Sequence, residues 1–179
     1  LAGPSHDGGP NQDCHGALLP TGHVLASKGI ALAVADGISS SRVSQEASQT
    51  AVAVFLADYY ATSDAWSVRR AAQRVISATN AWLHGQTMRS DARFDKDRGH
   101  VCTFSALVIK STTAHVFHVG DARVSLVSGA SIEHLTQEHR LVISSRESLW
   151  KTTISSMRLI ISGRKTFFSS PMMPLFMSE

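Results

Sequence analysis

The chain has 179 residues, enough for one domain with a buried core, and 43% of them are hydrophobic while 17% are charged. This balance is typical of a folded globular protein and excludes a wholly disordered chain. The net charge of +3 is too small to indicate a nucleic-acid-binding surface, and no apolar run approaches the roughly 20 residues of a membrane-spanning helix. We therefore expect neither a nucleic-acid partner nor a membrane segment.

The two cysteines, Cys14 and Cys102, lie far apart and match no metal-binding spacing. Unpaired cysteines of this kind are typical of a reduced compartment, so we expect a cytoplasmic protein. The chain starts at Leu1 rather than at Met, which we interpret as the edge of a fragment. Residues 1–10 lack the basic and apolar regions of a secretion signal.

Residues 1–22 are rich in Gly, Pro, Asn and Asp, and we expect a loop with room for a short edge strand. The apolar run at 30–35 stops at Asp36-Gly37. Its length and composition predict a strand that is buried on both faces, after which the chain turns.

Two helices are expected next. Serines 39–41 are expected to cap the first, which should end near Tyr59, and Ser63 or Asp64 the second, which should reach about Met88. Each helix carries an apolar stripe at helical spacing. The stripes are Val43, Ala47, Ala51, Val54 and Phe55 in the first helix, and Trp66, Val68, Ala72, Val75, Ile76, Thr79 and Leu83 in the second.

A polar connection at 89–100 precedes three expected strands at 101–110, 114–119 and 124–127. Helices followed by antiparallel strands indicate an α+β fold with helices packed on a sheet. After about Ser148 no period of 2 or 3.6 is visible, so we expect residues 149–179 to make few buried contacts.

Three acidic turns are candidates for chemistry, because hard cations such as Mg²⁺ prefer carboxylate and carbonyl oxygens. Asp36 follows the apolar strand, Asp13 lies in the preceding loop, and Asp121 follows Gly120. Taken singly, each is more typical of an ordinary turn than of a metal site.

Taken together and in order, five segments resemble the protein phosphatase 2C family, over about residues 11–148. They are Asn11-Gln12-Asp13, Ala33-Val34-Ala35-Asp36-Gly37, Cys102-Thr103-Phe104-Ser105-Ala106, Phe117-His118-Val119-Gly120-Asp121-Ala122-Arg123 and Leu135-Thr136-Gln137-Glu138-His139. The stretch at 38–48 and Trp82-Leu83-His84 are most similar to the phosphatase half of bacterial bifunctional phosphatase/kinase proteins, so a kinase domain is a possible neighbour in a longer parent.

The resemblance implies an α-β-β-α sandwich of antiparallel sheets flanked by helices, with two or three Mn²⁺ or Mg²⁺ ions. In the family, metal-activated water hydrolyses phosphoserine or phosphothreonine in proteins. Asp36 matches the bridging carboxylate, Gly37 the carbonyl ligand and Asp121 the acid that serves the third metal. Asp13 matches the acid that orients metal-bound water. Asp13 and Asp36 are therefore the expected catalytic residues, and Asp36, Gly37 and Asp121 the expected metal ligands.

The chain departs from the family pattern at four places. Residues 5–8 stand where the family has a phosphate-binding arginine, Gln12 replaces an acidic residue, and Ile38-Ser39 replace a histidine. The late Asp-Gly and Asp-Asn motifs are absent. We therefore expect little or no phosphatase activity, the alternative function being an inactive remnant or a phosphoprotein-binding module.

The last segment suggests why the late motifs are missing. If the reading frame were shifted forward by two bases, the codons of residues 167–174 would encode an apolar strand that ends in an acidic turn. We therefore interpret 1–148 as a partial phosphatase 2C-type domain with an incomplete C-terminal part, and 149–179 as a tail read out of frame.

Two other candidate sites fit the sequence less well. His100, His115 and His118 lie near Cys102, but alternation along a strand directs His115 and His118 to opposite faces, which argues against zinc. Serines 39–41 lack the Gly-x-Ser-x-Gly setting of a nucleophile, so helix capping is the better interpretation.

Overall fold

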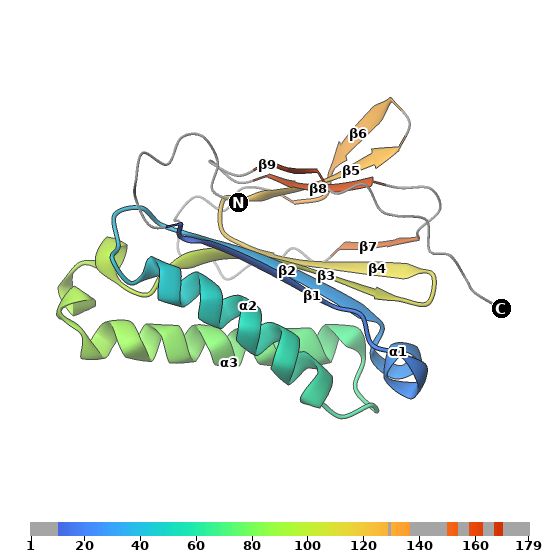
Figure 1. Cartoon of the computed structure of the whole chain (residues 1–179), viewed down its shortest axis with the longest axis horizontal. Coiled ribbons are helices and arrows are strands. Elements are labelled where there is room, and N and C mark those ends of the chain that lie inside the picture. The colour runs from blue at the N-terminus through green and yellow to red at the C-terminus, as the bar shows by residue number, and fades with distance from the viewer. Residues whose placement is uncertain (1–10, 129, 137–149, 154–157, 163–166, 170–179) are drawn as a thin grey trace.

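The computed structural model describes residues 11–128, 130–136, 150–153, 158–162 and 167–169, and the statements below concern these residues. Two antiparallel sheets lie face to face, and two long helices cover the outer face of the first sheet (Figure 1). The predicted α+β class is confirmed. The described residues supply one helix layer and two sheets of the expected α-β-β-α sandwich. None of the described helices is long and apolar enough to cross a membrane.

The first sheet has the strand order β1-β2-β3-β4-β7, with every neighbouring pair antiparallel. Its strands are β1 (Asp13–Leu18), β2 (Ile30–Gly37), β3 (Cys102–Lys110), β4 (Thr113–Val119) and β7 (Trp150–Thr153). The glycine-rich start of the chain therefore does contribute a short edge strand, β1. The strands expected at 101–110 and 114–119 are confirmed within one residue at either end.

The second sheet has the order β6-β5-β8-β9. It contains β5 (Arg123–Ser128), β6 (Ser131–His134), β8 (Arg158–Ser162) and β9 (Phe167–Ser169). The sequence pattern did not predict β6, whose residues are all exposed. Backbone pairing joins β7 to β4 and β8 to β5, but the side chains of 149–179 lie outside the described residues, so the expectation of few buried contacts there stays a prediction.

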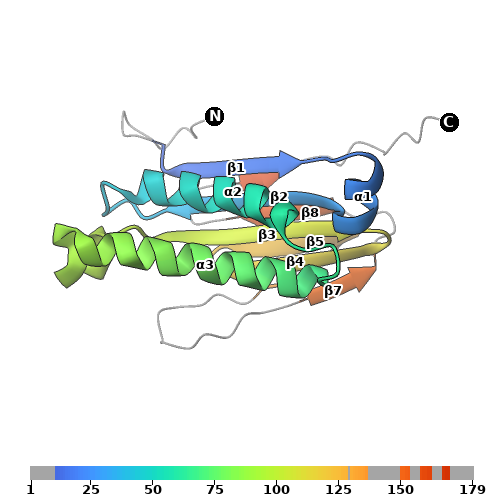
Figure 2. The same cartoon turned by 90° about the horizontal axis from the view of Figure 1, so that it is seen from below.

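Helices α2 (Ser44–Ala61) and α3 (Val68–Arg89) lie side by side across the sheet (Figure 2). Both were predicted, and their C-terminal ends lie within two residues of the expected ones. The predicted stripe of α3 is largely confirmed, since Val68, Ala72, Val75, Thr79 and Leu83 are all buried. Two short 3₁₀ helices, Asp91–Phe94 and Lys96–Arg98, occupy the polar connection.

The predicted helix caps are wrong. The residue before α2 is Val43, which makes no side-chain cap, and α3 is capped by Ser67, whose hydroxyl accepts a hydrogen bond from the Arg70 amide at 3.2 Å. Ser67 lies immediately before the first helical residue, the position from which a side chain reaches the orphan amides. Serines 39–41 lie too far upstream, and the hydroxyls of Ser40 and Ser41 donate instead to carbonyls of residues 97–99.

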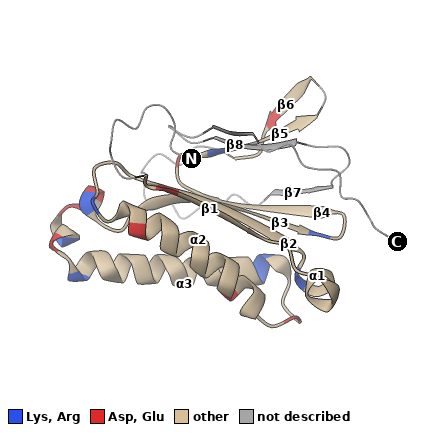
Figure 3. Cartoon of the chain, in the orientation of Figure 1, with Lys and Arg blue, Asp and Glu red and all other residues tan. Residues whose placement is uncertain are grey.

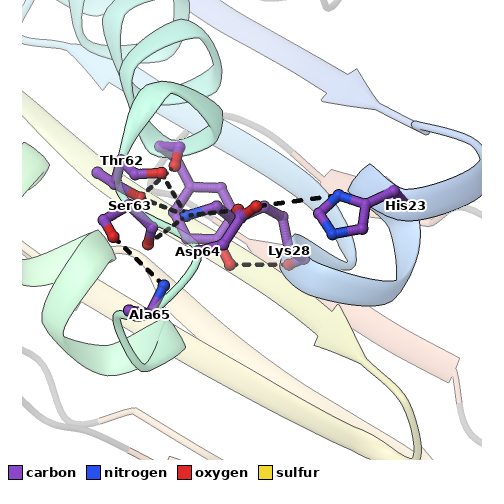
Figure 4. Close-up of polar contacts among 7 residues, drawn as sticks. His23, Lys28, Thr62, Ser63, Asp64 and Ala65 are labelled. Atoms are coloured by element: carbon purple, nitrogen blue, oxygen red, sulfur yellow. Dashed lines mark hydrogen bonds and ion pairs between the residues drawn. The ribbon is translucent and has the colours of Figure 1, made fainter.

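A third helix, α1 (Gly22–Lys28), was not predicted. Its side chains are mostly exposed, so it has no apolar stripe, but Lys28 is only 3% exposed. The Lys28 ammonium donates to the Thr62 carbonyl at 2.7 Å and to the Ser63 carbonyl at 2.9 Å, just past the end of α2, and lies 3.6 Å from the Asp64 carboxylate (Figure 4). A cation at a helix C-terminus complements the helix dipole. Lys28 thus joins α1 to the α2–α3 turn.

The main core lies between the helices and the first sheet. Phe55 and Tyr59 of α2 stack on each other, and Phe55 meets Phe104 of β3 edge-on with ring centroids 5.2 Å apart. Beneath them, every helix-facing residue of β2 up to Ala35 is a fully buried alanine, namely Ala31, Ala33 and Ala35.

The predicted burial of β2 on both faces is only partly right. The residues that alternate with these alanines are half-buried and face the second sheet, where Leu32 packs against a smaller cluster. That cluster includes Leu107, Val116 and Val124.

Candidate active site

The predicted site residues meet at one end of the first sheet. Asp13, the first residue of β1, lies directly opposite Asp36 near the end of β2, and Asp36 lies opposite Thr103 near the start of β3. Directly paired residues of antiparallel strands project from the same face of the sheet. The register therefore brings two carboxylates side by side, which no periodicity in the sequence could predict.

This pair faces the second sheet rather than the helices. Ala35, the neighbour of Asp36, is buried beneath the helices, and successive side chains of a strand point to opposite faces. Both Asp13 and Asp36 are half-buried. Apart from residues at or next to their ends, strands β1 to β4 carry no Asp, Glu, Lys or Arg (Figure 3), so the pair lies at a sheet end next to an apolar interior.

Asp121 lies in the turn after β4, at the same end of the first sheet as Asp13 and Asp36. The register of β3 with β4 pairs Phe104 with Val119, so the next residue, Gly120, comes level with Thr103. Gly120 has a φ of +114°, and a Cβ on it would lie 2.8 Å from the Thr103 Cβ, so glycine is required there. Thr103 also accepts a hydrogen bond from the Asp36 amide at 3.3 Å. It therefore links the ends of β2 and β4.

The segment that follows Asp36 is held closely. Gly37 packs against the first turn of α2, where a Cβ would lie 2.8 Å from the Ser44 carbonyl oxygen. Ser41 is 1% exposed, and its hydroxyl contacts the carbonyls of Arg98 and Gly99 at 2.9 and 2.7 Å. Burial and these partners exclude Ser41 as a nucleophile.

Sequence reasoning missed one buried polar pair next to the site. Ser105 and His118 are 1% and 3% exposed, and the Ser105 hydroxyl lies 2.9 Å from His118 Nδ1. The other ring nitrogen, Nε2, lies 3.0 Å from the Gly120 carbonyl, which accepts a hydrogen bond from it. The pair therefore supports the Gly120 turn. Alternation along β4 placed His118 and His115 on opposite faces, and the register agrees, since His115 pairs with Val108.

Two thiols border the site on its helix-facing side. Burial, with a smaller contribution from the nearby Asp36 carboxylate, raises the pKa of Cys102 to about 12. Burial also raises the pKa of Cys14. Both residues are free cysteines, and neither has the lowered pKa of a reactive nucleophile.

The donors at this sheet end fit a hard divalent cation in their chemistry. Carboxylates of Asp36 and Asp121 and the backbone of Gly37 offer oxygen, the ligand that Mg²⁺ and Mn²⁺ prefer. Within the described ranges, no group of three or more His, Cys, Asp and Glu side chains is arranged to hold a metal ion.

The last family-like motif is described only in part. Leu135 donates its amide to the Val124 carbonyl at 2.8 Å, and the Thr136 hydroxyl accepts from the Val124 amide at 2.9 Å. These bonds join the motif to β5, the strand that follows Asp121. Residues 137–139 lie outside the described residues.

Residues 2–164 match the family model of protein phosphatase 2C. Because this match spans most of the chain, and the fold and motif order agree with it, the chain belongs to the protein phosphatase 2C family. The resemblance inferred from five segments is thereby confirmed. No curated protein sequence matches the chain.

Solved structures with the same fold are bacterial serine/threonine phosphatases. The chain is similar to Stp1 from Staphylococcus aureus, with 13% identity, a TM-score of 0.69 and coverage of 90% of this chain and 72% of Stp1. The serine/threonine phosphatase of S. agalactiae has 17% identity, a TM-score of 0.62 and coverage of 85% and 72%. The catalytic domain of PstP, in complex with two manganese ions, has 17% identity, a TM-score of 0.57 and coverage of 83% and 76%.

Proposed function

We propose that this domain hydrolyses phosphoserine and phosphothreonine in proteins with water activated by Mn²⁺ or Mg²⁺. The observation that carries the proposal is the register of Asp13 opposite Asp36, on one face, at the sheet end that Asp121 also reaches. Adjacent carboxylates repel each other across a pair of strands, and divalent cations offset that repulsion. Manganese in the related PstP catalytic domain supports the choice of ion.

Each residue has a proposed role. Asp36 and Asp121 would hold the ions through their carboxylates, and Gly37 through its carbonyl. Asp13, adjacent to Asp36, would orient the attacking water and hold its proton. Bound ions would lower the pKa of that water and neutralise the phosphate. The rigid strand ends keep the carboxylates at a fixed spacing, which in-line attack on phosphorus requires.

Turnover by this chain is proposed to be weak. Gln12 is a neutral amide, and its nitrogen donates to the Ser41 carbonyl at 3.0 Å, so it adds no charge to the site. Ile38 and Ser39 provide no general acid. The second candidate function, a phosphoprotein-binding module without turnover, rests on these same two departures. Either function implies a phosphoprotein partner, and the free thiols of Cys14 and Cys102 accord with a cytoplasmic setting, with a kinase domain as a possible neighbour in a longer parent.

A phosphatase assay separates the two functions. The purified chain is incubated with a phosphothreonine peptide and millimolar Mn²⁺, beside the Asp36→Ala variant and a sample with excess chelator. We expect slow phosphate release that both the chelator and Asp36→Ala abolish. Release equal to that of Asp36→Ala, with the peptide still bound in a titration, would instead establish the binding module.

A further inference from the structure

Gln12 makes three hydrogen bonds, one each to Gly37 at the end of β2, to Ser41 in the segment that follows, and to Ser48 of α2. Its backbone carbonyl accepts from the Gly37 amide at 3.1 Å and from the Ser48 hydroxyl of α2 at 2.5 Å. Its side-chain amide donates to the Ser41 carbonyl at 3.0 Å. Gln12, which immediately precedes β1, therefore contacts both ends of the 37–41 segment and also α2.

Ser41 continues this chain of contacts. Its carbonyl also accepts from the Ser44 hydroxyl at 2.9 Å, and its own hydroxyl reaches the carbonyls of Arg98 and Gly99. The hydroxyl in turn accepts from the Val43 amide at 3.2 Å. Ser41 is buried, so water does not compete for these bonds, and buried polar groups that are satisfied in this way fix a local conformation.

Gly37, the proposed carbonyl ligand, lies in the middle of this arrangement. Its amide is bound to Gln12, and its Cα faces the backbone of Ser44 so closely that no side chain fits. Gly37, whose carbonyl is the proposed ligand, is thus held by Gln12 on one side and by α2 on the other.

We infer that Gln12 and Ser41 are positioning residues, which hold Asp36 and Gly37 in place for the metal and couple them to the Arg98–Gly99 segment. The inference rests on the proposed metal-dependent function. On this inference, the Gln12 side chain acts as a hydrogen-bond donor to the Ser41 carbonyl. Its effect on the site then comes from this hydrogen bond rather than from the lack of a carboxylate. A glutamate in this place accepts but cannot donate, and its charge would face the Ser41 carbonyl.

The test compares Gln12→Met, which removes the donor, with Gln12→Glu, which removes the donor and adds a charge. Ser41→Ala tests the other half of the pair, and Gln49→Met, on the exposed side of α2, is the matched control. Mn²⁺ affinity is measured by titration calorimetry, and global stability by urea unfolding. Outer-shell partners of a metal site are typically worth about 10–100-fold in affinity. We expect both Gln12 variants and Ser41→Ala to lose about 10-fold or more in Mn²⁺ affinity, and Gln49→Met to lose nothing.

Three results of these measurements would overturn the inference. Tighter Mn²⁺ binding by Gln12→Glu would establish that charge, not the donor, matters at this position. Unchanged affinity of Gln12→Met would remove the positioning role. A loss of affinity that merely follows a loss of global stability, with Ser41→Ala and Gln12→Met equally unfolded at the assay temperature, would also count against it.

Hydrogen exchange of the metal-free protein separates this inference from the proposed function. We expect faster amide exchange in a peptide that covers residues 37–43 of Gln12→Met, with the exchange of α3 unchanged. If the unsubstituted chain binds no Mn²⁺, the proposed function fails. The hydrogen-exchange measurement still tests the role of Gln12 in that case, because it needs no metal. Unchanged exchange at 37–43 would then refute the positioning role by itself.

Discussion

The contact between Gly37 and α2 allows a quantitative prediction for Gly37→Ala. The added Cβ would lie 2.8 Å from the Ser44 carbonyl oxygen and 2.9 Å from both the carbonyl carbon and the Cβ of Ser44. Ordinary contacts begin near 3.4 Å. The nearest atoms are backbone or lie next to it, so no flexible side chain can swing away, and β2 or α2 must move by roughly half an ångström.

Overpacking of this kind costs about 1–3 kcal/mol. In a protein of this size, each kcal/mol lowers the unfolding temperature by roughly 2–4 °C. We therefore expect Gly37→Ala to unfold several degrees earlier in a thermal scan followed by circular dichroism. It should also lose Mn²⁺ affinity, because the displaced peptide carries the proposed ligand.

The matched control is Gly85→Ala. Gly85 lies within α3, and a Cβ there meets no atom within 4 Å. Alanine is a better helix former than glycine, so this substitution should raise the stability by about 0.5–1 kcal/mol and leave Mn²⁺ binding unchanged. A Gly37→Ala protein as stable as the unsubstituted chain, or a Gly85→Ala protein less stable, would refute the reasoning from close contacts.

The remaining predictions concern two buried groups. Lys28→Met should lower the free energy of unfolding in urea by about 2–3 kcal/mol, because it removes the charged hydrogen bonds that a buried ammonium donates to the Thr62 and Ser63 carbonyls. Asp64→Asn should cost less than about 1 kcal/mol, since that carboxylate is 54% exposed. Equal losses for the two would contradict this account of the buried ammonium. Because the pKa of Cys102 is raised from 9.0 to about 12, the unfolded chain loses this proton before the folded one, so stability should be complete below pH 9 and fall as the pH rises towards 12. Urea midpoints measured across this range should fall less in Cys102→Ala, and an unchanged slope would disprove the assignment.

The sequence predicted those elements whose pattern reflects packing. The stripe of α3 and the apolar run of β2 were visible because each must bury one side against the other layers. The sequence did not predict helix α1, because a seven-residue helix with one buried side chain, Lys28, has no apolar stripe. The cap of α3 was misplaced because several polar residues precede the helix, and only the backbone geometry selects Ser67.

The candidate site could be predicted only from the resemblance of the sequence to the protein phosphatase 2C family. Asp13 and Asp36 are far apart in sequence, and their contact depends on the register of two strands, which single-residue patterns do not encode. The roles of Gln12 and Ser41 were missed for a similar reason. Both looked like ordinary loop residues, and serines near a helix start favour a capping interpretation until their hydroxyls are seen to point elsewhere.

The alanines of β2 restrict how this domain can diverge. Since Ala31, Ala33 and Ala35 leave only a methyl group between strand and helices, the larger side chains of this core come from the helices and the neighbouring strands, for example Phe55, Tyr59 and Phe104. Substitutions among these larger residues can exchange volume with one another, whereas a larger residue in β2 would overlap side chains that are already packed against it. Drift among related sequences should therefore accumulate on α2 and α3, and the strand that carries Asp36 should change slowly even at positions that never approach a substrate.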